Sequence, residues 1–233
     1  SGQWHFSFGN CGADIKTKDG RHFISGCYYG FPEGIGKPSS DGHVYVGGVT
    51  MRINPDGTGL EATGHNMRNP HDMCVTAFGD ILQSDNDDPA HCRSSWVMEY
   101  GNMGYADLRD GSRSWEEVAK TWEEPNGWSK GLRFSRSHWR ENYPGACPPG
   151  SIYGAGSPTG NLFIEDDTLG WQGAYLVCCM VRKEVMFSVP HLRDAQIEMS
   201  EHDTFLRLTP ETRQQQPFLP TDLVLGTDGT LFL

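Results

Sequence analysis

The sequence predicts an all-β fold, and three observations support this prediction. The 233 residues include 29 Gly, 14 Pro and 7 Trp but only 36% apolar residues, which is typical of short strands joined by turns and long loops. Residues 43–46 and 49–53 alternate between apolar and polar side chains before a turn at residues 54–59. Apolar residues also flank Ala77–Asp80, where Gly79 would supply the positive φ of a hairpin turn. This length suits one large all-β domain or two small ones.

The hairpin around Gly79 recurs along the chain. Its unit is an Asp before alternating apolar residues, then a Gly turn, then an apolar pair. The unit occupies residues 71–82 and again 221–233, with the same internal spacing, and a weaker copy spans residues 159–177. The first strand, residues 2–6, matches only the second half of the unit. Repeated strand pairs with irregular connections predict a β-propeller, whose blades are four-stranded sheets.

The repeats predict that residues 1–233 form an incomplete propeller. Closed propellers have about four to eight blades, and we expect about three to four here, with the chain starting and stopping in the middle of a unit. Exposed sheet edges at both ends would favour self-association or pairing with missing blades. A plain β-sandwich is the alternative, because short, evenly patterned strands suit both architectures.

Charge and cysteine spacing exclude several classes of function. The net charge of −11 and the pI near 5.2 argue against a nucleic-acid partner, because nucleic-acid binding leaves a basic footprint. No apolar run is long enough for a transmembrane segment. The seven cysteines form no C-x-x-C pair, and without C-x-x-C-H this segment has no haem site. Cys178 and Cys179 lie on a predicted strand, face opposite sides and are expected to be buried free thiols.

Residues 107–143 differ from the rest of the chain. Four tryptophans stand there among charged residues without strand alternation: Trp115, Trp122, Trp128 and Trp139. Residues 114–120 begin with a Ser followed by a Glu at the third position, which predicts a short helix. A loop of this length is usually functional or disordered, and its four Trp favour an ordered insertion.

An acidic run follows the second strand of the Gly79 hairpin. Its side chains, Asp85, Asn86, Asp87 and Asp88, offer the hard oxygen ligands that calcium prefers. The run lacks the alternate spacing of an EF-hand loop, so one or two side chains would bind together with backbone carbonyl groups. The alternative is a solvated acidic turn.

A polar cluster precedes the first strand of that hairpin. The planar guanidinium of Arg68 could hold a carboxylate through two hydrogen bonds, or it could pair with a structural acid such as Asp72. His71 could act as a catalytic base, because an imidazole changes charge near neutral pH. Alternatively, His71 only donates or accepts a hydrogen bond in the turn.

Several motifs occur in an order that resembles the glucose/sorbosone dehydrogenase family of soluble quinoprotein sugar dehydrogenases. They are Gly64-His65, Arg68-Asn69-Pro70, residues 81–85 and residues 100–105. The sequence looks closest to a branch of planctomycete-type multidomain, membrane-bound dehydrogenases that carry haem-binding domains. The matches to that branch are residues 52–58, 84–88, 97–102 and 156–160.

The resemblance implies a six-bladed propeller that oxidises an aldose at pyrroloquinoline quinone (PQQ), with calcium holding the quinone. It also implies a periplasmic or secreted, extracellular location and a partner that is a sugar or a small molecule derived from a polysaccharide. Carried over by position, Arg68 and Asn69 would contact the quinone with His71 beside them. Residues 85–88 would lie at the family's calcium loop.

Two departures bear on catalysis. The family's quinone-binding arginines near the last repeat correspond here to the neighbourhood of Phe218 and Pro220, which carry no charge. The family's catalytic histidine would fall before Ser1, so the isolated segment is expected to be inactive. Two classes of function therefore stay open: a PQQ-dependent sugar oxidoreductase, and a non-catalytic propeller module that binds carbohydrate or a protein partner.

Candidate substrate-binding residues lie near the long loop and the third repeat. They are Asn102, Tyr105, His138, Trp139, Ser157 and Thr159. Exposed aromatic rings can stack on sugar rings, whereas plain packing against the propeller is the alternative for loop aromatics. Residues 156–160 are expected to shape a turn that enters a strand.

Overall fold

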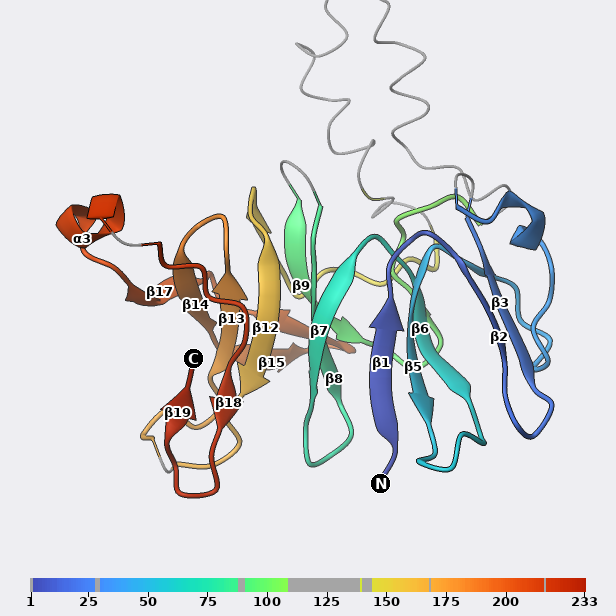
Figure 1. Cartoon of the computed structure of the whole chain (residues 1–233), viewed down its shortest axis with the longest axis horizontal. Coiled ribbons are helices and arrows are strands. Elements are labelled where there is room, and N and C mark those ends of the chain that lie inside the picture. The colour runs from blue at the N-terminus through green and yellow to red at the C-terminus, as the bar shows by residue number, and fades with distance from the viewer. Residues whose placement is uncertain are drawn as a thin grey trace, which may run out of the picture. The chain divides into compact units, whose positions relative to one another are not determined.

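The computed structural model describes residues 2–27, 30–87, 91–108, 139, 144–167, 169–215 and 217–233. These residues form strands and turns, with a short 3-10 helix η1 (Pro32–Gly34) and a short helix α3 (Pro210–Gln215) (Figure 1). The all-β prediction is therefore confirmed. Across the described ranges, no helix is both long and apolar enough to cross a membrane.

The chain divides into two compact units. Unit 1 comprises Ser1–Pro70 and Met98–Cys147, and unit 2 comprises His71–Val97 and Pro148–Leu233. The predicted helix at residues 114–120 and the tryptophans Trp115, Trp122 and Trp128 lie outside the described residues.

Unit 1 contains two sheets. The four-stranded sheet has the order β1 (Trp4–Phe8), β5 (Gly48–Ile53), β6 (Glu61–Met67) and β10 (Gly101–Asn102). The three-stranded sheet has the order β2 (Ala13–Lys16), β3 (His22–Gly26) and β4 (Tyr45–Val46). The core combines buried side chains from both sheets: Phe23, Tyr45, Val49, Met51, Leu60 and Ala62. Val49 and Met51 are two residues apart on β5, so they share the buried face of the strand.

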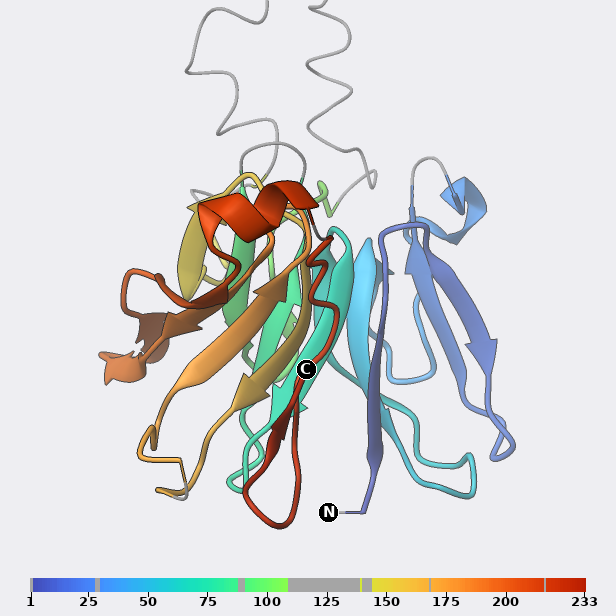
Figure 2. The ribbon, with the colours of Figure 1, turned by 60° about the vertical axis from the view of Figure 1, so that its left-hand side comes forward.

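Unit 2 contains two four-stranded sheets and two hairpins. The first sheet has the order β11 (Ser151–Gly154), β9 (Cys92–Val97), β8 (Ile81–Asp85) and β7 (Pro70–Val75). The second, drawn in gold to orange in Figure 2, has the order β12 (Pro158–Phe163), β13 (Tyr175–Cys179), β14 (Glu184–Ser188) and β17 (Asp203–Arg207). The hairpins are β15 (Pro190–Arg193) with β16 (Gln196–Met199), and β18 (Val224–Leu225) with β19 (Leu231–Phe232).

The three four-stranded sheets have the strand arrangement of propeller blades. In each of them the order of the strands across the sheet follows their order along the chain, and not the Greek-key order of a sandwich. In the four-stranded sheet of unit 1 the short strand β10 pairs with β6 in parallel. The prediction of a partial β-propeller is confirmed.

The predicted hairpin turn at Gly79 has a backbone that recurs in the chain. The Gly79 N–H donates to the Thr76 carbonyl at 2.9 Å, the Thr76 N–H donates to the Asp80 carbonyl at 2.9 Å, and Gly79 has a φ of 91°. The same pair of hydrogen bonds closes the turns at residues 17–21, 39–43, 54–58 and 226–230. The last of these joins β18 to β19, so the repeat inferred between residues 71–82 and 221–233 is confirmed.

The interpretation of the first strand is wrong. β1 pairs with β5 from Trp4 opposite Ile53 to Phe8 opposite Val49, and it forms the edge of a complete four-stranded sheet. It is therefore not the second half of a unit. The residues between β1 and β5 carry the three-stranded sheet, and this insertion separates β1 from its partner in the sequence.

The adjacent cysteines on β13 face opposite sides, as predicted. Cys179 packs with Leu82 and Cys92, whereas Cys178 packs with Ile164 and Val185. All seven cysteines are described, and all are free thiols. Burial raises the pKa of Cys178 to about 12, so this thiol stays protonated at neutral pH.

Candidate functional site

The backbone near the N-terminus holds the connection from β6 to β7. The Asn10 N–H donates to the Arg68 carbonyl at 2.7 Å. A Cβ atom at Gly9 would lie 2.9 Å from the Asn69 side-chain oxygen, so the Asn69 side chain lies close to the backbone at position 9. The side chain of Arg68 is half-buried and that of Asn69 is exposed.

His71 and Asp72 follow in β7 and belong to unit 2, whereas Arg68 and Asn69 belong to unit 1. His71 is exposed. The Asp72 carboxylate accepts a hydrogen bond from the Asn161 N–H at 2.9 Å, so β12 engages this acid. Burial is the main cause that raises the pKa of Asp72 above its ordinary value.

The described part of the acidic run is not a solvated turn. Asp85 and Asp87 are buried, and Asn86 donates to the Gly156 carbonyl at 3.4 Å. Asp87 and Cys92 are linked by the Asp87 N–H, which donates to the Cys92 Sγ at 3.3 Å. Asp88 lies outside the described residues. Within the part of the chain that the structure describes, no three His, Cys, Asp or Glu side chains gather to hold a metal. Calcium binding therefore stays a prediction.

Residues 156 and 157 lead into β12, which begins at Pro158, so the expected entry into a strand is present. The Ser157 N–H donates to the Cys179 Sγ at 3.3 Å, and the Ser157 carbonyl accepts from the Met180 N–H at 3.0 Å. The Thr159 hydroxyl is buried and donates to the Pro220 carbonyl at 3.1 Å. Both residues thus contact the neighbouring backbone, which gives Thr159 a structural role.

Two of the candidate aromatic residues lie in the interior of unit 1. Tyr105 and Trp139 are 1% and 2% exposed, and their rings meet edge to face with centroids 5.3 Å apart. Asn102 is half-buried, and its side-chain oxygen accepts from Asn66 at 2.7 Å and from the Gly104 N–H at 3.0 Å. His138 lies outside the described residues.

Two buried polar residues on β6 were not among the predicted site residues. Asn66 has a φ of 64° and donates to the Ala106 carbonyl at 2.8 Å, which fixes the segment that carries Asn102 and Tyr105. His65 packs edge-on against Tyr45 at 5.2 Å. Burial, aided by nearby His43, lowers the pKa of His65 to about 4, so its ring is neutral at pH 7. A signal for Asn66 was available, because Asn tolerates left-handed backbone better than most residues.

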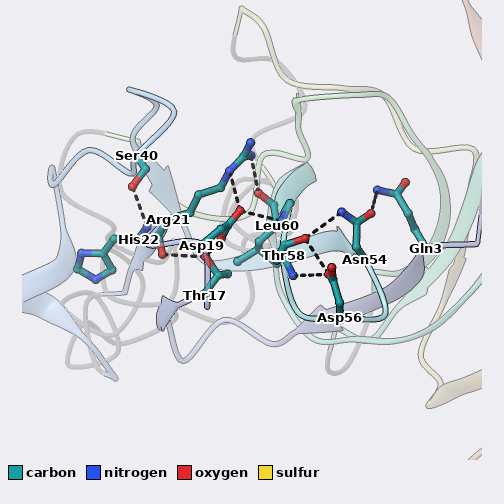
Figure 3. A network of polar contacts seen from close by, with 11 residues as sticks. Gln3, Thr17, Asp19, Arg21, His22, Ser40, Asn54, Asp56, Thr58 and Leu60 are labelled. Carbon is teal, nitrogen blue, oxygen red and sulfur yellow. Dashed lines mark hydrogen bonds and ion pairs between the residues drawn. The ribbon is translucent and has the colours of Figure 1, made fainter.

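A polar network joins two of the recurrent turns in unit 1 (Figure 3). The Asp19 carboxylate accepts from the Gly59 N–H at 3.0 Å, and Arg21 donates to the Leu60 carbonyl at 3.2 Å. Asp56 accepts from both the N–H and the hydroxyl of Thr58, at 3.0 and 2.7 Å. These contacts involve backbone or neighbouring turn residues, so they hold the two turns together.

Unit 2 contains a cavity of about 530 Å³ that sequence reasoning also missed. Aromatic, aliphatic and acidic side chains line it, drawn from the β7–β8 turn, β9, the β12–β13 connection and the β15–β16 hairpin. The lining consists of Thr76, Phe78, Asp80, Leu82, Trp96, Phe163, Glu165, Gln172, Gly173, Pro190, His191, Leu192 and Ile197.

The fold is similar to that of solved sugar dehydrogenases. A glucose dehydrogenase-type oxidoreductase from Thermus thermophilus is 15% identical, with a TM-score of 0.55 over 96% of this chain and 58% of its own. The PQQ-bound aldose sugar dehydrogenase of Streptomyces coelicolor is 13% identical, with a TM-score of 0.51 over 93% of this chain and 52% of its own. The soluble aldose sugar dehydrogenase of Escherichia coli, in its apo form, is 15% identical, with a TM-score of 0.55 over 97% and 60%.

The chain spans a little over half the length of these relatives. Its sequence matches no protein-family model and no curated protein sequence. At this level of identity the likeness concerns the fold. Together with the chain-ordered blades, it shows that this chain has the β-propeller architecture of the glucose and aldose sugar dehydrogenases.

Proposed function

We propose that the chain is part of a sugar dehydrogenase that oxidises an aldose at PQQ. The observation that carries this proposal is the fold shared with sugar dehydrogenases, one of which is a PQQ-bound form. The motifs that resemble the quinoprotein family support it independently. A periplasmic or extracellular location and a sugar-derived substrate belong to the same proposal.

The donors at the β6–β7 connection fit an anionic quinone. PQQ bears three carboxylates, and a guanidinium such as that of Arg68 can hold one of them bidentately. Asn69 and His71, which are exposed, add an amide and an imidazole. When bound, PQQ would accept two electrons from the sugar. Arg68 would orient the quinone, and His71 is the candidate group in this segment for taking the proton of the sugar hydroxyl.

The fit to calcium is weaker. Asp85 and Asp87 are buried oxygen ligands of the kind that calcium prefers, but the described residues contain no complete ligand group. The calcium part of the proposal therefore rests on the resemblance. Asp88 or residues outside the described ranges would have to complete the coordination shell.

The test is reconstitution of the full-length parent protein with PQQ and calcium. We expect PQQ to bind and an aldose to reduce a dye. A charged hydrogen bond is worth about 1.5–3 kcal/mol, so Arg68→Ala should weaken PQQ binding roughly ten- to a hundredfold. Arg68→Lys should restore part of the affinity. Arg193→Ala, which removes an exposed arginine of the β15–β16 hairpin, is the matched control. A parent that neither binds PQQ nor reduces the dye contradicts the proposal.

A second candidate function is a non-catalytic module that binds carbohydrate or a protein partner. One observation favours it: no three His, Cys, Asp or Glu side chains gather as a metal-ligand group among the described residues. Titration of the parent with sugars in the absence of PQQ distinguishes the two. Sugar binding by a protein that never binds PQQ supports the module.

A further inference from the structure

One of the recurrent turns departs from the other four at a single position. The residue before the turn glycine is Asp in four turns and Phe78 in the fifth; the four acids are Asp19, Asp41, Asp56 and Asp228. Each Asp accepts a backbone N–H of its own turn or of a neighbouring loop, at 2.9 or 3.0 Å. Phe78 accepts none and is 95% exposed. A local rule broken without local compensation is expected at functional positions.

Phe78 lies at the cavity of unit 2. The rings of Trp96 and Phe163, both half-buried, line the same space from β9 and β12. Leu192, 74% exposed, contributes from the β15–β16 hairpin. Three aromatic rings and an exposed leucine thus surround a volume of about 530 Å³, which falls within the usual range for small-molecule sites of about 300–1,000 Å³.

The charges in the lining are of one sign. Asp80 follows the turn glycine and accepts from the Trp96 Nε1–H at 3.1 Å, which fixes the indole. Glu165 accepts from the Ala77 N–H, and its carbonyl accepts from Gln172 at 3.1 Å. No Lys or Arg belongs to the lining of this cavity. His191 does, but its Nε2 lies 3.9 Å from Glu198, which is not part of the lining.

We infer that this cavity binds a small organic cation of the quaternary ammonium or alkylammonium class. The faces of aromatic rings attract cations, and Trp does so most strongly. The carboxylates of Asp80 and Glu165 add complementary charge, and the apolar walls suit the alkyl groups of such a cation. The inference needs no quinone and is separate from the proposed dehydrogenase activity.

The test compares choline with its neutral isostere, 3,3-dimethylbutan-1-ol, by calorimetric titration of the full chain. The two probes have nearly the same shape, so a difference in affinity isolates the positive charge. We expect choline to bind at least about tenfold more tightly, which corresponds to about 1.4 kcal/mol. Added salt should weaken choline binding and leave the isostere unchanged.

Three variants locate the site. Phe78→Asn keeps a residue suited to turns but removes the ring, and it should weaken choline binding about fivefold or more without loss of fold. Glu165→Gln should weaken choline binding and spare the isostere. Asp228→Asn makes the corresponding change of charge in an equivalent turn outside the cavity and should have no effect on binding.

Three outcomes overturn the inference. Equal binding of choline and its isostere would mean an apolar pocket without charge selectivity. Tighter binding of cellobiose than of choline, lost in Phe78→Asn, would mean a carbohydrate subsite. No heat from either probe at about 10 mM, a concentration at which even weak, millimolar binding would register, would mean no site for this class of ligand.

Discussion

The turns at residues 54–58 and 76–80 have the same backbone and opposite surroundings. In both, the glycine N–H donates to a carbonyl three residues earlier at 2.9 Å, and the glycine φ is 83° or 91°. In unit 1 the side chains around Asp56 form hydrogen bonds with each other and with backbone (Figure 3). In unit 2 the equivalent turn exposes Phe78 beside a cavity. Glycine sets the backbone, and the residue before it determines how the turn is used.

The largest expected effect is a loss of stability of unit 1 in acid. The pKa of His65 is about 4 in the folded chain, against an ordinary 6.5, so below pH 6.5 the unfolded chain takes up a proton that the folded chain refuses. The free energy of unfolding should therefore fall by roughly 3 kcal/mol between pH 6.5 and 4, at 1.36 kcal/mol per pKa unit.

Denaturant unfolding at several pH values measures this loss, and hydrogen exchange assigns it to a unit. His65→Phe should flatten the pH dependence in this range and keep the edge-on contact with Tyr45. If the free energy of unfolding of His65→Phe depended on pH as steeply as that of the unchanged chain, another group would be responsible. Unit 1 would then not be the acid-sensitive unit.

The second effect tests whether the two turns are equivalent. Gly57→Ala and Gly79→Ala each force a left-handed backbone on a residue with a Cβ atom, which costs about 1–2 kcal/mol. No atom lies within 4 Å of a Cβ at Gly79, and carbons of Lys18 at 3.5 Å or more are the neighbours at Gly57. The two losses in unfolding free energy should therefore agree within about 0.5 kcal/mol, which is the usual scatter between independent sites. Clearly unequal losses would break the comparison.

A third, smaller effect is expected when the residue before the turn glycine is exchanged between the two kinds of turn. Phe78→Asn supplies an acceptor for the turn backbone and should raise the free energy of unfolding by about 0.5 kcal/mol. Asp56→Phe removes the contacts to Thr58 and should lower the thermal midpoint. Calorimetric melting checks both. A stabilised Phe78→Asn that binds choline less well would be a trade between stability and function. A destabilised one would mean that Phe78 packs usefully where it is.

The smallest effect concerns the carboxylates of the closed turns. The Thr58 hydroxyl is the main cause that lowers the pKa of Asp56, whereas the Thr230 N–H is the main cause for Asp228. Thr58→Val should therefore raise the pKa of Asp56 more than Thr230→Val raises that of Asp228. NMR titration of the two carboxyl carbons gives both values. Because these pKa values are depressed, the stabilisation is present above the ordinary pKa and is lost as the pH falls through the lowered one.

The sequence predicted those parts of the fold that local rules determine. The hairpin at Gly79, the turn at residues 54–59 and the repeat at residues 221–233 follow from glycine and alternating apolar residues, and all three are present. The place of β1 was not predictable in this way. Its partner β5 lies beyond an insertion, and pairing over such a distance leaves no local pattern.

The candidate site was harder to predict than the fold. The type of Asp85 and Asp87 indicates oxygen ligands, but whether these acids face solvent or the interior depends on the neighbouring strands. The same holds for Tyr105, whose ring packs on Trp139. The cavity is lined by residues from separate stretches of unit 2, so no single sequence motif predicts it. The one local signal was Phe78 in a position where the equivalent turns have Asp.

The free thiols allow unfolding of the chain to be followed by chemical labelling. Of the seven cysteines, Cys11 is the exposed one, and burial raises the pKa of Cys74 to about 12 and that of Cys92 to about 11. A thiol must ionise to react, so a short treatment of native protein with maleimide at pH 7 should modify Cys11 first. A molecule with more than one label has exposed its buried cysteines, so the fraction of such molecules measures unfolding. The same reaction places a single probe in unit 1, where the acid-induced changes are expected.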